Sequence, residues 1–129
     1  MTKVRRVLAL REIIQAKLKE IHPNVFYEDA STENIFPRLV CFLDDSIDDG
    51  IVEQFSLEVD AWDCPEDGST MTLEQLISDV DLALHRQVIV RDGLSFRFYR
   101  LNRRTIRDND KRIKRRQYVY EIKVMGVNR

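Results

Sequence analysis

The sequence has little of what metal centres and nucleophilic active sites are built from. Its 129 residues include two histidines, two cysteines and four glycines. His22 and His85 are far apart in sequence and fall at expected helix ends, where capping is a simpler role than metal binding. The glycines are isolated and form no phosphate-binding loop, and no serine or cysteine lies in a histidine-bearing pattern that would activate it. The sequence therefore names no reaction and predicts no cofactor, metal or catalytic residue.

Long apolar runs are also missing. No stretch approaches the ~20 apolar residues needed to span a bilayer. The first residues, MTKVRRVLALREII, carry charges and lack a small-residue cleavage site, so no signal peptide is expected. Cys41 lies in an apolar strand pattern and Cys64 just after a strand, and both are interpreted as reduced thiols and not as a disulfide. We therefore expect a protein made in the cytoplasm, with no membrane partner.

Acidic and basic residues are separated along the chain, although the net charge is only −1. Residues 1–27 carry +4, residues 28–81 carry −15 with Arg38 as their one base, and residues 82–129 carry +10. Opposed blocks of charge indicate an oriented electrostatic surface. They argue less for a polyanion binder than a uniformly basic sequence would.

The clearest structural signal is the stretch Glu53–Asp63, EQFSLEVDAWD. Its residues alternate between apolar and polar with a period of two, which places Phe55, Leu57, Val59 and Ala61 on one face of a sheet. At about 3.3 Å per residue the stretch would span roughly 36 Å. We therefore expect a central strand that the rest of the chain covers or extends.

The remaining patterns predict two helices and further strands around this one. The helices are Lys3–Ile21, capped by Thr2, and Thr72–Gln87, with Thr72 and Gln75 as a capping box. Strands are expected at Asn24–Glu28, Arg38–Asp44, Glu53–Asp63, from Leu94 onward, and Gln117–Met125, with turns at Asp45–Gly50, Cys64–Ser69 and Asp92–Gly93 and a polar connection over Asp29–Phe36. This order predicts a single α+β domain over residues 1–129, in which a mainly antiparallel four- to five-stranded sheet packs against two helices.

Residues 102–116 (NRRTIRDNDKRIKRR) are strongly basic and have little apolar content. Asp108-Asn109-Asp110 is a turn signal in their middle. The strand patterns on either side would extend into this segment as a projecting charged β-arm, or else it is a loop; the sequence leaves both open.

Two opposed groups of charges are the candidate interface. No aromatic residue is interleaved with the bases of residues 102–116, which favours an acidic partner over nucleic acid. Because different patches of neighbouring copies meet in a head-to-tail ring, the basic segment is expected to contact the acidic turn of the adjacent copy. The basic group is Arg103, Arg104, Arg107, Lys111, Arg112, Lys114 and Arg115, and the acidic group is Asp44, Asp45, Asp48, Asp49 and Glu53.

One alternative involves catalysis. Glu121 and Lys123 lie two apart on an expected strand and so share a face, a spacing that some metal-dependent nucleases use together with carboxylates from neighbouring strands. Asp60 or Asp63 would have to supply those carboxylates. A solvated strand face of alternating charge explains the same residues more simply.

The order and character of the elements resemble a known family. The segments LREIIQAKLKEI, FPRLVCFLDDS, EQFSLEVDAWD, TLEQLISDVDLALH and YVYEIKV follow one another as in the tail terminator, or tail-completion, proteins of long-tailed bacteriophages and prophages. The resemblance covers nearly the whole chain and includes no catalytic motif.

The resemblance implies a structural virion protein at the head–tail junction. Such proteins form a homo-oligomeric ring, usually a hexamer, on the last ring of tail tube protein, stop tube growth and join the head connector or stopper protein. Genomic DNA passes through the central channel without specific binding. The alternatives that the sequence leaves open are another neck protein, a basic-arm nucleic-acid-binding module, or a nuclease.

Overall fold

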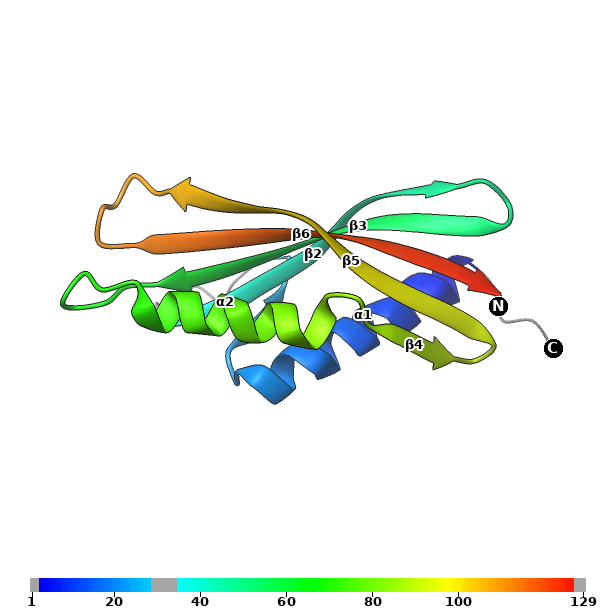
Figure 1. Ribbon diagram of the computed structural model, residues 1–129, viewed down its shortest axis with the longest axis horizontal. Coiled ribbons are helices and arrows are strands. Elements are labelled where there is room, and N and C mark those ends of the chain that lie inside the picture. Colours follow the sequence, from blue (N-terminus) through cyan, green and yellow to red (C-terminus); the bar gives the residue numbers. More distant parts are fainter. Residues whose placement is uncertain (1–2, 29–34, 127–129) are drawn as a thin grey trace.

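The computed structural model describes residues 3–28 and 35–126, which form two helices and a six-stranded sheet (Figure 1). The helices are α1 (Lys3–Ile21) and α2 (Met71–Leu84). The strands are β1 (Val25–Tyr27), β2 (Arg38–Asp48), β3 (Val52–Asp63), β4 (Val88–Arg91), β5 (Leu94–Arg107) and β6 (Lys114–Gly126). The predicted α+β class with two helices is confirmed, but six strands replace the four to five expected. The predicted cap at Thr2 and most of the connection before Pro37 lie outside the described residues.

The strand order is β1-β2-β3-β6-β5-β4. β1 pairs in parallel with β2, and the four other neighbouring pairs are antiparallel. β3 occupies the middle: it pairs with β2 on one side and, from Val52 opposite Met125 to Asp63 opposite Lys114, with β6 on the other. The sequence prediction of a long central strand is therefore confirmed.

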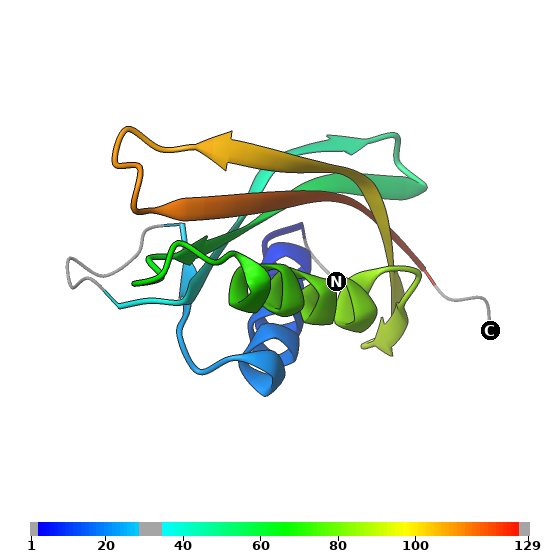
Figure 2. The same cartoon turned by 60° about the vertical axis from the view of Figure 1, so that its left-hand side comes forward.

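Both helices pack on one face of the sheet, which curls around them as a half-barrel (Figures 1 and 2). The four apolar side chains of β3 that the alternation predicted are buried in the core. Against them lie the apolar stripe of α2 and, from α1, side chains that are fully buried. These core residues are Leu73, Leu76, Ile77, Val80 and Leu84 of α2 and Leu10, Ile14 and Leu18 of α1. Within the described residues, neither helix is long and apolar enough to cross a membrane.

α2 begins and ends earlier than predicted. Its N-cap is Thr70, which makes no side-chain capping hydrogen bond, so the predicted capping box does not form; the Gln75 side chain donates instead to Asp79 at 3.0 Å. The helix stops at Leu84 because the next backbone groups pair with β5: Arg86 N–H donates to the Phe98 carbonyl at 2.8 Å, and Phe98 N–H donates to the Gln87 carbonyl at 2.9 Å. Sheet pairing thus replaces the last helical turn.

This pairing leads into β4, the strand that the sequence prediction missed. β4 has four residues, too few to show an alternation, and it forms a hairpin with β5 through Asp92 and Gly93. Both turn residues have positive φ, 54° and 77°, as a two-residue hairpin turn requires. The predicted turn at these two residues is confirmed.

Two long hairpins project from the sheet. β5 continues to Arg107 and β6 starts at Lys114, so residues 102–116 form the β-arm that was one of two predictions; we call them the arm. The predicted Asp108–Asp110 turn lies at its tip, where Asp108 Oδ1 accepts Asp110 N–H at 2.9 Å. The predicted turn Asp45–Gly50 is wrong in extent, because β2 continues to Asp48 through a register shift between Leu43 and Ser46.

Candidate functional site

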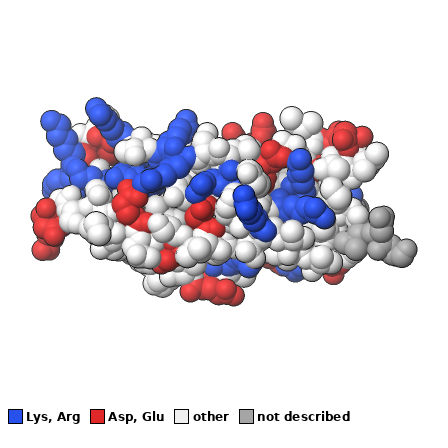
Figure 3. Space-filling view, viewed as in Figure 1, with Lys and Arg blue, Asp and Glu red and all other residues white. Residues whose placement is uncertain are grey.

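The arm and the acidic hairpin, which comprises residues 44–53 at the tip of β2 and β3, lie at opposite ends of the molecule (Figures 1 and 2). The pairing of β3 with β6 imposes this arrangement. The first residue of β3, Val52, is paired with Met125 near the end of β6, and the last, Asp63, with Lys114 at its start. In Figure 3 lysine and arginine gather over the arm at one end, with some acidic side chains below them, and aspartate and glutamate appear over the acidic hairpin at the other end, with some basic side chains nearby.

The root of the arm, meaning the part that adjoins the sheet core around Arg100, Arg103 and Arg116, is bonded to α2. Arg103 and Arg116 both contact the Glu74 carboxylate, the latter through Nε at 2.6 Å. Arg100 donates to Asp81 at 2.7 Å. A register shift in β5 between Arg100 and Asn102 turns Arg103 toward the helices, because one extra residue reverses which side chains face each side of a strand. Arg103, a predicted interface residue, is thus engaged within its own chain.

The helix-free face of the sheet holds two more of the predicted bases. Arg104 donates through Nε to Gln117 Oε1 at 3.0 Å and lies 3.7 Å from Glu58. Arg115 lies 3.3 Å from Asp60 and 3.9 Å from Asp108. Burial, followed by the charges of Asp44 and Asp60, raises the pKa of Glu58, and the neighbouring Arg104 guanidinium opposes this shift. Arg104 and Arg115 therefore also serve the fold.

Trp62 is the centre of a row of side chains that the sequence analysis did not single out. The strand register places Arg38 on β2 and Arg115 on β6 on either side of it. Their guanidinium carbons lie 4.7 and 3.7 Å from the tryptophan ring centroid, within the range of cation–π attraction. Burial and the charge of Arg115 lower the pKa of Arg38. This row covers the helix-free face of the sheet next to the arm.

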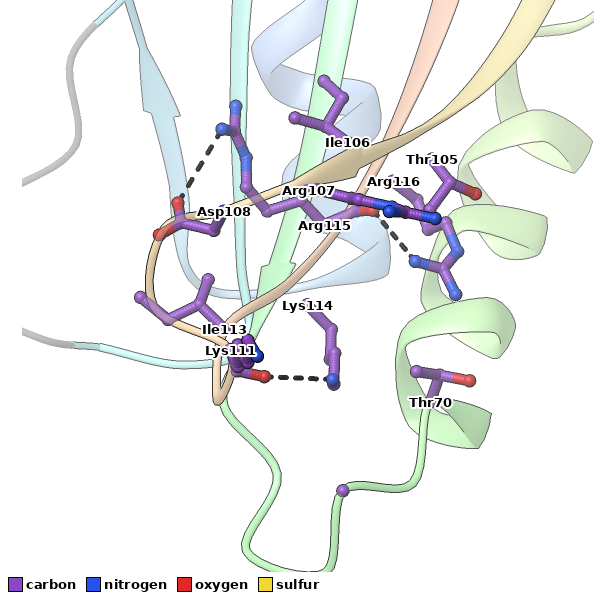
Figure 4. A pocket seen from close by; sticks show the side chains of 11 residues that line it. Thr70, Thr105, Ile106, Arg107, Asp108, Lys111, Ile113, Lys114, Arg115 and Arg116 are labelled. Carbon is purple, nitrogen blue, oxygen red and sulfur yellow. Dashed lines mark hydrogen bonds and ion pairs between the residues drawn. The ribbon is translucent and has the colours of Figure 1, made fainter.

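The tip of the arm encloses a hollow of about 480 Å³ that faces the loop before α2 (Figure 4). We call it the arm hollow. Its wall combines cations and one acid with apolar groups, among them Arg107, Lys111, Lys114 and Asp108 beside Ile106 and Ile113. Lys114 Nζ donates to the Lys111 carbonyl at 3.0 Å. No contact with a carboxylate is found for Arg107, Lys111 or Lys114 within residues 3–28 and 35–126, so the hollow keeps an excess of positive charge.

Arg112 lies at the same tip but is neutralised locally. Its guanidinium contacts Asp110 at 2.8 Å. This hydrogen bond, together with one from the Arg112 backbone, lowers the pKa of Asp110 to about 2. The pair stabilises the turn and leaves Arg107, Lys111 and Lys114 as the cations that the arm presents outward.

Three of the five predicted acids shape the acidic hairpin. Asp48 Oδ1 accepts Gly50 N–H at 2.8 Å. Asp49 Oδ1 accepts the N–H groups of Ile51 and Val52 at 2.9 and 2.7 Å, and these bonds lower the pKa of Asp49. Glu53 is buried, 4% exposed, and lies 3.6 Å from Arg6, so it is not a surface residue as predicted.

The outer surface of the acidic hairpin consists of acids and large apolar side chains together. Asp44 and Asp45 are exposed. Ile47 and Ile51 are 68% and 80% exposed. Two large apolar side chains therefore lie at the surface beside two carboxylates.

Some of the predicted interface residues are therefore bonded within their own chain, and others are exposed. The basic and acidic groups do not meet within one chain. Sequence reasoning missed two acids of α2: Glu74, the partner of Arg103 and Arg116, and Asp81, the partner of Arg100. Their spacing of seven residues, two helical turns, was the available signal that they share one side of the helix.

The possible nuclease group is not assembled. Glu121 contacts Lys123 at 3.4 Å. Asp60 pairs with Gln117, four residues from Glu121 along β6 and hence roughly 13 Å away, and Asp63 falls on the other face of β3. Among the residues that the structure describes, no group of three or more histidine, cysteine or acidic side chains is placed to hold a metal ion.

Fold and site together define a small α+β protein with one curled sheet and oppositely charged ends. A chain of a structure described as the virion of a native gene transfer agent (GTA) particle has the same fold, with a TM-score of 0.66 at 12% identity over 88% of this chain and 92% of that one. A second solved structure, whose name states no function, gives a TM-score of 0.72 at 15% identity over 100% and 99% of the two chains. No family model and no curated protein matches the sequence. The chain therefore shares its fold with a virion component.

Proposed function

We propose that the chain is a tail terminator, a structural virion protein that forms a ring at the head-proximal end of a phage tail tube. In this role it stops polymerisation of the tube protein and provides the surface to which the head connector attaches. It carries out no bond-breaking step and needs no cofactor. DNA passes through the ring without specific recognition.

The observation that carries this proposal is the placement of opposite charges at opposite ends of one sheet. A subunit with different, complementary ends makes heterologous contacts, which generate a ring when the rotation between copies closes. A twofold dimer would instead need a self-complementary patch. The fold shared with a virion component over most of both chains supports the same role.

The helix-free face of the sheet offers a surface for a further partner. Exposed apolar side chains are spread over it, from β2 across to the edge strand β4. They are Ile47, Val88, Val90, Tyr99 and Leu101, each more than half exposed. We propose this face as the contact with the tail tube or the head connector, since large exposed apolar areas mark protein interfaces.

Electron microscopy of particles made without this protein tests the role. Because nothing would stop the tube from growing, we expect abnormally long tails without heads. Tails of normal length that lack heads would point to another junction protein of the neck. Normal particles, or metal-dependent DNA cleavage by the purified chain that is abolished by Glu121→Gln, would contradict a structural role.

A further inference from the structure

We infer that the arm hollow is the receptor for the acidic hairpin of a second copy of this chain. The inference rests on the proposed ring and specifies its contact: the tip around Ile51 enters the hollow beside Lys111 and Lys114. It assigns the contact to the far end of the arm and not to the arm as a whole, since the arginines at the root are bonded to α2 and β3.

The two surfaces match in charge. The arm hollow presents Arg107, Lys111 and Lys114, for which no carboxylate contact is found among the described residues. The acidic hairpin presents Asp44 and Asp45, both exposed. Charges at such a contact steer the encounter and fix its register more than they add affinity.

They also match in apolar character. Ile51 is 80% exposed at the outermost turn of its hairpin, and Ile106 and Ile113 line the hollow. The hollow, at about 480 Å³, falls within the ~300–1,000 Å³ of small-ligand sites, which suits a hairpin tip better than a whole strand. Burying the exposed isoleucine would supply the apolar part of the contact.

A contact between these two surfaces requires a second copy, because they cannot meet within one chain. The antiparallel pairing of β3 with β6 over its full length holds them at opposite ends. The tip is also preformed: Asp49 accepts two backbone N–H groups there, so little conformational entropy is lost on docking.

Disulfide cross-linking tests the contact directly. Ile51→Cys and Thr105→Cys are combined in one chain, with Cys64→Ser to remove the partly exposed native thiol; Cys41 is fully buried. Thr105 lines the hollow and is uncharged. Oxidation of the concentrated purified chain should give a ladder of dimers and larger species on a non-reducing gel. The matched control carries Leu82→Cys in place of Thr105→Cys. Leu82 is 79% exposed and lies on α2 away from the hollow.

Charge reversal then tests the chemistry of the contact. Lys111→Glu with Lys114→Glu should lower the ladder yield about tenfold, because attraction becomes repulsion at two positions. Adding Asp44→Lys and Asp45→Lys should restore it. These acids are preferable to Asp48 and Asp49, whose side chains bond to the backbone of the turn.

The inference is overturned if the ladder is absent, if the Leu82→Cys control gives an equal ladder, or if the compensating reversals restore nothing. Binding of a short DNA duplex that Lys111→Glu with Lys114→Glu abolishes, without any ladder, would also overturn it. If cross-linking gives the ladder but particles made without the protein have normal tails, the contact is supported and only the terminator role is contradicted. Overlong tails without a ladder would overturn only the contact.

Discussion

Replacing Phe96 with alanine should destabilise the protein by about 3–5 kcal/mol. Phe96 is fully buried in β5, between Ile89 of β4 and Val124 of β6. Removing its ring leaves a cavity in the region where the sheet curls around the helices. Since domains of this size are stable by only ~5–15 kcal/mol, the variant should be close to unfolding. Urea denaturation followed by circular dichroism measures the change.

The neighbouring exposed residue provides the matched control. Arg97→Ala, one position along the same strand, should change the free energy of unfolding by less than about 0.5 kcal/mol, as for most surface substitutions. Equal effects at positions 96 and 97 would show that β5 does not present alternate faces to core and solvent.

Replacing Asp81 with alanine should cost about 2–3 kcal/mol. Asp81 accepts a hydrogen bond from the Tyr120 hydroxyl at 2.8 Å and another from Arg100 at 2.7 Å. Tyr120 is fully buried, and burial together with the bond to Asp81 raises its pKa. Without the carboxylate its hydroxyl would stay buried and unpaired, which accounts for most of the cost; the partly exposed Arg100 contributes less.

Two further variants separate this hydrogen bond from general helix effects. Asp79→Ala, on the same helix, loses only the bond to Gln75 among the residues that the structure describes and should cost less than about 0.5 kcal/mol. Combining Asp81→Ala with Tyr120→Phe removes the unpaired hydroxyl and should recover part of the loss. If the double variant is as unstable as the sum of the single ones, the two groups are not coupled.

The features best predicted from the sequence are those with strong local patterns. The alternation in β3 predicted both its length and its buried face, because a strand of eleven or twelve residues leaves little ambiguity in period. The Asp108–Asp110 and Asp92–Gly93 turns followed from residues that favour tight turns.

The features that were missed depend on contacts between distant segments. The early end of α2 results from backbone pairing of Arg86 and Gln87 with Phe98, more than ten residues away, and β4 continues this pairing along β5. The extra length of β2 depends on a register shift opposite β3. Local propensity does not contain such information, because tertiary pairing overrides it.

In the candidate site, too, the local charge pattern was predictable and the contacts between distant segments were not. The sequence identified two opposed groups of charge, and the structure places them at opposite ends. Which charges are free for a partner was not predictable. That depends on α2 bringing Glu74 beside Arg103 and Arg116, and on the ion pair between Asp60 of β3 and Arg115 of β6.

Cryo-electron microscopy of the particle's tail tests the central claim most directly, since it would show where the copies of this chain lie. We expect a closed ring confined to the head-proximal end of the tube, with the arm of each copy against the acidic hairpin of the next. Copies distributed along the tube, or a ring in which these two surfaces are far apart, would contradict it.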